Sequence, residues 1–90
     1  MKKIFKYELK ITGIQYISMP QGSEILCIQT QHNSPCIWAL VDPIAESINR
    51  KFETVGTGYN VTEIEKSKYI GTYQIDGGAL VFHVFELFGK

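Results

Sequence analysis

The stretch Glu24-Ile-Leu-Cys-Ile-Gln-Thr-Gln-His-Asn-Ser-Pro-Cys-Ile-Trp-Ala-Leu-Val-Asp42 decides how this chain is expected to fold. Its two halves are rich in apolar and β-branched residues, and His32-Asn-Ser-Pro35 between them is a run of turn-forming residues. The stretch therefore predicts two antiparallel strands, 24–32 and 35–42, joined by a tight turn. It also holds both cysteines, the only tryptophan and one of the two histidines.

A two-residue turn at Asn33-Ser34 would place Gln29 opposite Trp38 and Cys27 opposite Leu40. One face of the hairpin is then uniformly small and apolar and is predicted to be core. The other face, called the mixed face below, combines an indole plane with amide groups, which is typical of pockets that stack a planar ring and read its edge. A partly buried core or interface tryptophan is the alternative interpretation. The mixed face carries Ile25, Cys27, Gln29, Gln31, Cys36, Trp38 and Leu40.

Alternating apolar residues and turn-forming residues predict further strands on both sides of this hairpin. After Asp42-Pro43, the pattern fits either a helix that begins at Pro43 or a loop 43–47 followed by a strand. The strand is favoured because the run continues into Val55-Gly-Thr-Gly58, which would interrupt a helix. Residues 62–66 form at most one helical turn. The other predicted strands are 2–11, 14–18, 69–75 and 79–88, with a turn at 19–22 and a hairpin turn at Asp76-Gly77-Gly78.

The last strand is apolar on both of its faces, and this decides the predicted architecture. A single twisted sheet leaves one face open to water, so this strand needs a second sheet or a second subunit over it. Ninety residues form one domain. We therefore expect a single domain over residues 1–90 that is all-β and mainly antiparallel. It should be a small β-sandwich or a barrel-like domain with at most one short helix, and it should assemble as a homo-oligomer.

Charge and cysteine content argue against several classes of partner. Nine basic residues balance nine acidic ones, whereas proteins that bind nucleic acids or membrane surfaces carry basic excess. Neither DNA or RNA nor a membrane is therefore expected as a partner, and no signal peptide is recognised. Cys27 and Cys36 are not opposite one another in the hairpin, so reduced thiols are expected rather than a disulfide. With His32 and His83 they make no close ligand pair, so neither a metal nor another cofactor is expected.

Arg50 is the only arginine, and it comes shortly before Gly56-Thr57-Gly58. Backbone amides at the two glycines can form an anion-binding nest, and the Thr57 hydroxyl adds another donor. A guanidinium binds phosphate in a forked geometry, so this stretch is a candidate phosphate site. The alternative is a glycine bulge together with a surface ion pair from Arg50 to Glu46 or Glu53.

His83 is expected in the middle of the last strand, beside Thr72 in one register of the final hairpin. Such a histidine is more often a satisfied buried group than a base. The sequence contains no recognisable nucleophile elbow, Cys–His dyad or pair of carboxylates. No catalytic residue is therefore predicted, and the protein is not expected to be an enzyme.

Seven short stretches stand out in this order: Met1-Lys-Lys-Ile-Phe-Lys-Tyr7, Met19-Pro-Gln-Gly22, Glu24-Ile-Leu26, Trp38-Ala-Leu-Val-Asp-Pro43, Gly56-Thr-Gly58, Tyr69-Ile-Gly-Thr72 and Gly78-Ala-Leu-Val-Phe-His-Val-Phe-Glu86. Taken together, they resemble a family of small bacteriophage and prophage proteins of unknown function. The resemblance covers nearly the whole chain and carries no catalytic motif.

This resemblance implies a biological setting. Small phage proteins of this size are often counter-defence factors, and several unrelated groups are compact homo-oligomers that sequester nucleotide immune signals such as cyclic dinucleotides or cyclic ADP-ribose variants. By analogy, we expect a protein of the host cytoplasm that binds such a signal without cleaving it. A protein-interaction module that inhibits a host protein, or a small nucleotide-cleaving enzyme, is the alternative. The expected ligand-binding residues are Gln29, Gln31, Trp38, Arg50, Gly56, Thr57, Gly58, Tyr59 and His83.

Overall fold

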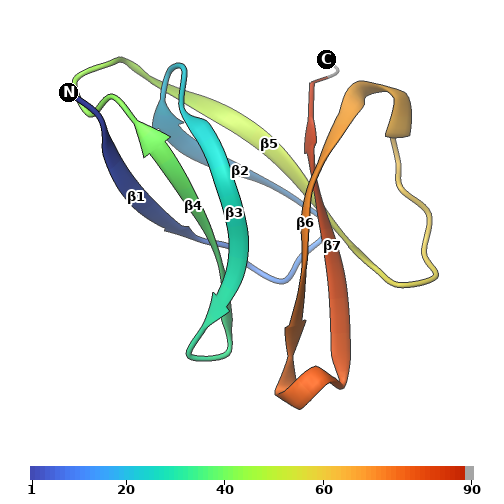
Figure 1. Cartoon of the computed structure of the whole chain (residues 1–90). Helices are drawn as coiled ribbons and strands as arrows, with labels where there is room; N and C mark the ends of the chain where they lie inside the picture. Colours follow the sequence, from blue (N-terminus) through green and yellow to red (C-terminus); the bar gives the residue numbers. More distant parts are fainter. Residues whose placement is uncertain (89–90) are drawn as a thin grey trace.

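The computed structural model describes residues 1–88 and shows an all-β chain, as predicted (Figure 1). Two single-turn 3-10 helices, η1 (Ile64–Lys66) and η2 (Asp76–Gly78), are the helical segments of this part of the chain, and η1 falls where a helical turn was expected. The strands are β1 (Lys3–Glu8), β2 (Ile14–Pro20), β3 (Glu24–Gln31), β4 (Ser34–Val41), β5 (Ser47–Gly56), β6 (Ser67–Ile75) and β7 (Leu80–Leu87).

The strands form two antiparallel sheets that pack together. One sheet has the order β1-β4-β3 and the other the order β2-β5-β7-β6. In Figure 1 the first sheet lies on the left, β6 and β7 lie on the right, and β2 and β5 cross behind. The sheets come closest where β3 lies beside β6. The tips of the β3–β4 and β6–β7 hairpins are also tied together, because Asn33 exchanges two hydrogen bonds with Asp76, at 3.0 and 2.9 Å.

The central hairpin forms as predicted, but its turn is one residue earlier than expected. His32 and Asn33 are the turn residues, and both have positive φ angles, 53° and 64°. Two consecutive left-handed residues are the geometry of a type I′ turn, whose twist matches that of the flanking strands. Gln29 therefore lies opposite Cys36 rather than Trp38. Because both ends of the turn moved by one residue, the side chains between the turn and Cys27 stay on their predicted faces.

A β-bulge corrects one member of the mixed face. The register of β3 against β4 shifts between Ile25 and Cys27, so that Ile25 lies opposite Ala39 and Cys27 opposite Trp38. Ile25 consequently packs against the core. The extra residue, Leu26, is left exposed. A bulge re-aims side chains in this way because two residues of one strand face a single residue of its partner.

The segments that flank the hairpin agree with the predictions in kind but differ in length. A strand, β5, follows the loop after Pro43, so the helix considered for this segment is wrong. β1 ends at Glu8, three residues before the predicted end of that strand at Ile11. β2 continues through Pro20, and the turn that follows has Gly22 at φ 81° with the Ser23 N–H bonded to the Pro20 carbonyl at 3.1 Å.

The core lies between the inner faces of the two sheets. Ile37 of β4, Phe52 of β5 and Val84 of β7 are completely buried there. Burial of one such side chain contributes about 1.5–3 kcal/mol to folding. The buried core residues are Leu9, Met19, Ile28, Ile37, Ala39, Val41, Phe52, Tyr73, Ile75 and Val84.

The second apolar face of β7 is partly covered by the segment that connects β5 to η1. Glu53 of β5, only 6 % exposed, accepts hydrogen bonds from the backbone N–H and the hydroxyl of Thr62. Val61 then lies against the same hollow as Phe85. The connection between β5 and η1 therefore shields part of the second apolar face of β7 from water, and a second subunit is not needed for that part.

Gly71 of β6 sits where the two sheets come closest. A Cβ atom at this position would lie 2.4 Å from Cγ2 of Ile28 on β3, which is far below van der Waals contact. Ile28 is buried and branched at Cβ, so it has little freedom to turn away. Only a residue without a side chain fits between β6 and β3 here.

Gly71→Ala is therefore expected to destabilise the protein by about 1–3 kcal/mol, the usual cost of overpacking a core. Urea denaturation measures the loss. Gly13→Ala is the matched control, since a Cβ there meets no atom within 4 Å. In an Ile28→Ala background the added cost of Gly71→Ala should shrink, and equal costs in the two backgrounds would contradict the close contact.

Two buried hydroxyls in the core, those of Thr54 and Tyr73, have no hydrogen-bond partner of good geometry among the described residues. Burial raises the pKa of Tyr73 above its ordinary value, and the nearby Thr54 hydroxyl offsets part of the rise. The unfolded chain, with a tyrosine pKa of about 10, loses this proton first. The contribution of Tyr73 to stability is therefore fully present below about pH 10 and falls as the pH rises further.

Tyr73→Phe should consequently lose less stability than the wild type between about pH 9.5 and 11.5, because the variant has no phenol to ionise on unfolding. Thermal or urea unfolding across this pH range provides the measurement. Near neutral pH the variant should be close to wild type, since the hydroxyl it removes is unpaired. A parallel loss in both proteins would refute a role for the Tyr73 phenol.

Candidate functional site

A continuous chain of side-chain hydrogen bonds surrounds His83 on the outer face of the four-stranded sheet. The Nε2 atom of His83 lies 2.7 Å from Oγ1 of Thr57, and its Nδ1 atom lies 2.8 Å from Oγ1 of Thr72. Oγ1 of Thr72 is in turn 2.5 Å from the hydroxyl of Tyr69. Four polar side chains are thus linked in the order Tyr69, Thr72, His83, Thr57. We call these four residues, with Tyr59, the Thr57–His83 site.

The sheet positions three of these residues through its register. Thr72 of β6 lies directly opposite His83 of β7, as one predicted register of the hairpin had it. Tyr69 and Thr72 are three residues apart, so in a regular strand they would point to opposite faces. A bulge between Tyr69 and Gly71 removes this alternation, and both side chains reach the outer face. Tyr69 also packs edge-on against Phe85, with 5.5 Å between ring centroids.

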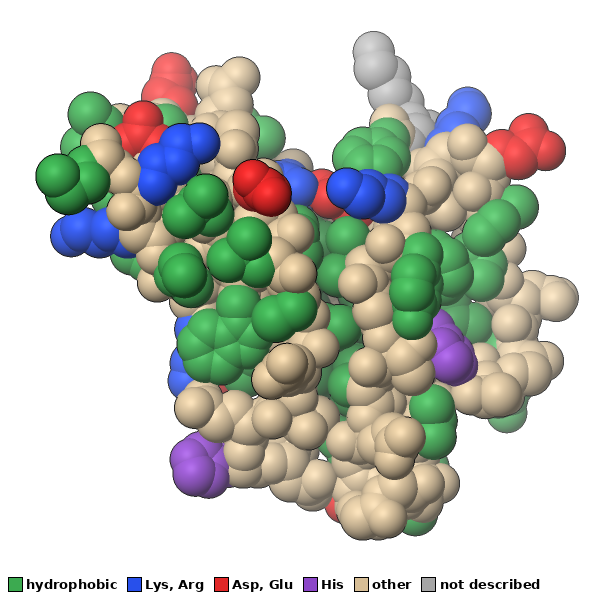
Figure 2. Space-filling model, viewed as in Figure 1, with side chains coloured by type: hydrophobic (Ala, Val, Ile, Leu, Met, Phe, Trp, Pro, Cys, Tyr) green, Lys and Arg blue, Asp and Glu red, His purple; other side chains and the backbone are tan. Residues whose placement is uncertain are grey.

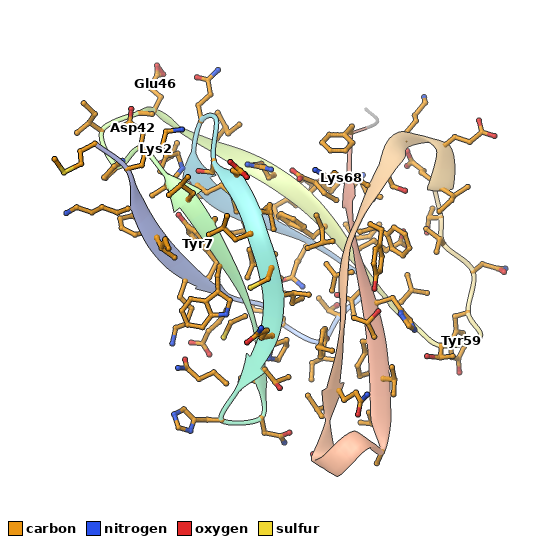
Figure 3. All side chains as sticks on the ribbon, in the orientation of Figure 1. Lys2, Tyr7, Asp42, Glu46, Tyr59 and Lys68 are labelled. Carbon is orange, nitrogen blue, oxygen red and sulfur yellow. The ribbon has the colours of Figure 1, made fainter. Side chains whose placement is uncertain are left out.

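The turn after β5 supplies the other side of the site. Thr57 follows the strand directly, and the Tyr59 N–H bonds back to the Gly56 carbonyl at 3.1 Å. The turn passes through Gly58 with φ 93°, a conformation that favours glycine. The ring of Tyr59 lies against Gly56, where a Cβ would be 3.2 Å from the ring. Tyr59 is 79 % exposed, and Figure 3 shows it projecting from the chain that follows β5.

Two hollows adjoin this turn. One, of about 170 Å³, is lined by Thr57, Tyr69 and His83 together with Val61 and Phe85. The other, of about 500 Å³, lies towards the β6–β7 hairpin and is lined by Leu80 and Phe82 among others. Gly56, Thr57 and Tyr59 line both hollows, so the aromatic ring of Tyr59 stands between them.

Gln29, Gln31 and Trp38 lie elsewhere, on the outer face of the three-stranded sheet. Trp38 is half-buried and is flanked by Lys6 and Cys27 on the neighbouring strands. Gln31 accepts a hydrogen bond from the Lys6 ammonium at 2.8 Å. Figure 2 shows hydrophobic side chains gathered over β1, β3 and β4 on this side of the molecule. The mixed face is therefore an outward-facing surface of the sheet.

Gln29 is the predicted site residue that connects the two regions. It lines a hollow of about 300 Å³ at the junction of β3 and β6, and Thr72 lines the same hollow. The outer face of one sheet thus continues into that of the other at this junction. Trp38 and Gln31 are not among the residues that line this hollow or the two beside Thr57.

Arg50 is also separated from the glycine turn and is fully engaged in an ion pair. Its Nε and Nη2 atoms donate to the Glu86 carboxylate at 2.6 and 2.8 Å, and Nη1 donates to the Ser23 carbonyl at 2.5 Å. Seven residues of extended chain, about 20 Å, separate Arg50 from Thr57. Arg50 therefore forms an ion pair, as the alternative interpretation of the sequence expected. Its partner is Glu86, however, and neither Glu46 nor Glu53 bonds to Arg50.

The Arg50–Glu86 pair is largely withdrawn from water, since its side chains are 16 % and 5 % exposed. The hydrogen bonds to Glu86 raise the pKa of Arg50, although burial opposes part of the rise. The pair lies in a hollow of about 620 Å³ with Tyr16, Ile48 and Phe88 among its lining residues. Arg50 joins β5, β7 and the β2–β3 turn at this end of the molecule.

The chemistry that the Thr57–His83 site offers is neutral hydrogen bonding beside aromatic rings. Hydroxyls donate and accept, and a neutral imidazole does the same through its two nitrogens. No cluster of three or more His, Cys, Asp or Glu residues that could hold a metal ion occurs within residues 1–88. Over the same residues, no helix is long and apolar enough to cross a membrane.

A family model described as "Domain of unknown function (DUF7352)" matches residues 1–89 of this chain. The chain belongs to the DUF7352 family. No curated protein and no solved structure matches it. The fold of this DUF7352 chain is therefore described from its own strands and their register, without a known structure for comparison.

Three of the stretches that stood out in this DUF7352 sequence meet at the Thr57–His83 site: Gly56–Gly58, Tyr69–Thr72 and Gly78–Glu86. Sequence reasoning identified Thr57 and His83 but missed Tyr69 and Thr72 as site residues. The quoted stretch Tyr69-Ile-Gly-Thr72 contained both, but its bulge could not be recognised, because an ordinary strand would have placed only one of them on this face. Glu86 was missed as the partner of Arg50 because it lies 36 residues away in sequence.

The buried ion pair between Arg50 and Glu86 leads to a prediction of how substitutions of these residues change the stability of the protein. Arg50→Met leaves the buried Glu86 carboxylate without its partner, which typically costs about 3–5 kcal/mol. The double variant Arg50→Met/Glu86→Leu should lose less than the single one, because no charge is then left buried. Urea denaturation compares the two, and Lys51→Met on the same strand is the control, expected within about 0.5 kcal/mol of wild type. A double variant less stable than Arg50→Met would contradict this account.

Proposed function

We propose that this protein binds a small nucleotide-derived ligand through its base at the Thr57–His83 site and holds it without cleaving it. The observation that supports this proposal is the convergence of three separate stretches of the sequence on one chain of hydroxyl and imidazole groups beside exposed aromatic rings. Such groups match the edges and the faces of a nucleobase, which is planar and carries both donors and acceptors.

Each part of the site has a role in such binding. Tyr59 offers an exposed ring on which a base can stack, and stacking of a base on an aromatic side chain is worth about 1–3 kcal/mol. Thr57 reads the edge of the ring through a hydrogen bond, and His83 holds the Thr57 hydroxyl in place. The two hollows on either side of Tyr59 hold the base and the sugar.

This arrangement replaces the phosphate clamp that the sequence suggested. Arg50 is paired with Glu86 and lies about 20 Å away along β5, so it holds no ligand phosphate at the Thr57–His83 site. His83 is the basic side chain at this site. Base recognition therefore contributes more to binding than phosphate recognition does, and nucleosides should bind nearly as well as the corresponding nucleotides.

The resemblance to small phage proteins supplies the biological context of the proposal. A phage protein that holds a nucleotide immune signal intact in the host cytoplasm lowers its free concentration and so counters the defence that the signal activates. A homo-oligomer would enclose the ligand more fully, because the hollows at the Thr57–His83 site are open to one side and a second copy could cover them.

Calorimetry against nucleosides, cyclic dinucleotides and ADP-ribose derivatives tests the proposal. We expect at least one of these ligands to bind, Thr57→Val and Tyr59→Ala to weaken it about tenfold, and Trp38→Leu to leave it unchanged. A ligand released intact on heating, as judged by chromatography, supports holding without cleavage. No heat with any ligand at protein concentrations well above micromolar would rule the function out.

A second candidate function, docking of a host protein, is supported by the surface around Trp38. Ile4 and Leu26 are large apolar side chains that are 61 % and 46 % exposed on the outer side of the same sheet. Exposed apolar patches often mark protein interaction sites. A stoichiometric protein recovered from host lysate by the wild type but lost with Trp38→Glu would favour this function over ligand binding.

A further inference from the structure

The hydrogen-bond chain at the Thr57–His83 site has a direction, because each of its members has only one proton to give. Each hydroxyl of Tyr69, Thr72 and Thr57 donates once, and a neutral imidazole carries one proton on either Nδ1 or Nε2. The chain makes three hydrogen bonds among these four donors. One donor is therefore left over: at Thr57, at Tyr69 or, if Thr72 accepts from both of its neighbours, at Thr72.

Three arrangements satisfy these bonds, and they differ in what Thr57 presents to a ligand. If Tyr69 donates to Thr72 and Thr72 donates to Nδ1, then the proton of His83 is on Nε2 and points at Thr57. The Thr57 hydroxyl is then free to donate into the hollow. If every bond runs the other way, Thr57 gives its only proton to Nε2 and can only accept from a ligand, while the free donor is at Tyr69. In the third arrangement Tyr69 and a proton on Nδ1 both donate to Thr72, Thr57 again gives its proton to Nε2, and the free donor is at Thr72.

We infer that the chain runs from Tyr69 to Thr57, so that Thr57 presents a hydrogen-bond donor to the ligand. A phenol is a stronger acid than an aliphatic alcohol, so Tyr69 is a better donor and a poorer acceptor than Thr72. A neutral histidine also carries its proton on Nε2 more readily than on Nδ1. The first preference excludes the fully reversed chain, and the second excludes both arrangements with a proton on Nδ1. Together they leave only the chain from Tyr69 to Thr57, in which Thr72, which holds Nδ1 as an acceptor, is the positioning residue that transmits the direction.

The direction of the chain narrows the ligand class of the proposed function, on which this step rests. A ring carbonyl can accept the hydrogen bond that the Thr57 hydroxyl donates. An amino group at the same place is itself a donor, so it would leave the Thr57 hydroxyl without an acceptor. A donor that the ligand buries without an acceptor weakens binding by roughly five- to 150-fold, which corresponds to about 1–3 kcal/mol. The site should thus select bases with a carbonyl edge, such as hypoxanthine or uracil, over those with an amino group at that position.

Nitrogen-15 NMR of the free protein tests the direction without any ligand. We expect Nε2 of His83 to be protonated and Nδ1 to be the unprotonated acceptor when the ring is neutral. His32, exposed in the β3–β4 turn, is the internal control for the assignment. A proton on Nδ1, or equal populations of the two forms, would overturn the inference.

Two variants show whether the far end of the chain sets the direction. Thr72→Val removes the partner of Nδ1, and Tyr69→Phe removes the donor that begins the chain, so each should raise the Nδ1-protonated fraction of His83 at least twofold. Thr12→Val, in the loop before β2, and Tyr16→Phe, on β2, should leave it unchanged. Unaltered His83 nitrogen shifts in both test variants would refute the role of Thr72 and Tyr69.

Ligand selectivity gives a second, separate result. Inosine should bind about tenfold more tightly than adenosine, and uridine more tightly than cytidine, and Thr57→Val should remove both preferences. Equal or reversed preferences would overturn the inferred donor at Thr57. If no nucleoside binds, the proposed function fails, whereas the position of the His83 proton still decides the direction of the chain.

Discussion

The closeness of Gly71 to Ile28 is the constraint on which the rest of this fold depends. The two sheets, of three and four strands, come together along one edge, where β6 meets β3 with no room for a side chain between them. The inner faces of both sheets then enclose Phe52, Ile37 and Val84. Without that approach, the apolar inner face of β7 would be open to water.

The same bulge of β6 that contains Gly71 also shapes the outer face of the sheet. Because the register shifts between Tyr69 and Gly71, the side chains of Tyr69 and Thr72 lie on the same face of the sheet, whereas in a regular strand they would lie on opposite faces. The close contact on the inside and the hydrogen-bond chain on the outside therefore have one cause. A change that straightens β6 to relieve the core would also separate Tyr69 from Thr72.

The parts of the structure that local patterns determine could be predicted, and those that depend on register could not. Period-two alternation correctly assigned the faces of the central hairpin except at Ile25 and Leu26, and the Gly56 run correctly favoured a strand over a helix for β5. The turn was placed one residue late because both Asn33-Ser34 and His32-Asn33 contain turn-forming residues, and only the left-handed angles of the structure distinguish them. The bulges at Leu26 and Ile70, and the pairing of Arg50 with Glu86, have no local pattern, since each arises from packing between distant segments.

The pairing of Arg50 with Glu86 bears on how the proposed ligand would be recognised at the Thr57–His83 site. An arginine suits this buried position because its planar fork can bind a carboxylate with two nitrogens and a backbone carbonyl with the third, which a lysine cannot do. The single arginine of the sequence is therefore committed to holding β5, β7 and the β2–β3 turn together. The Thr57–His83 site is left with hydroxyls, an imidazole and aromatic rings, which gain little from the charge of a phosphate. Discrimination there must come from matching donors to acceptors, so the direction of one hydrogen-bond chain matters more than the net charge of the ligand.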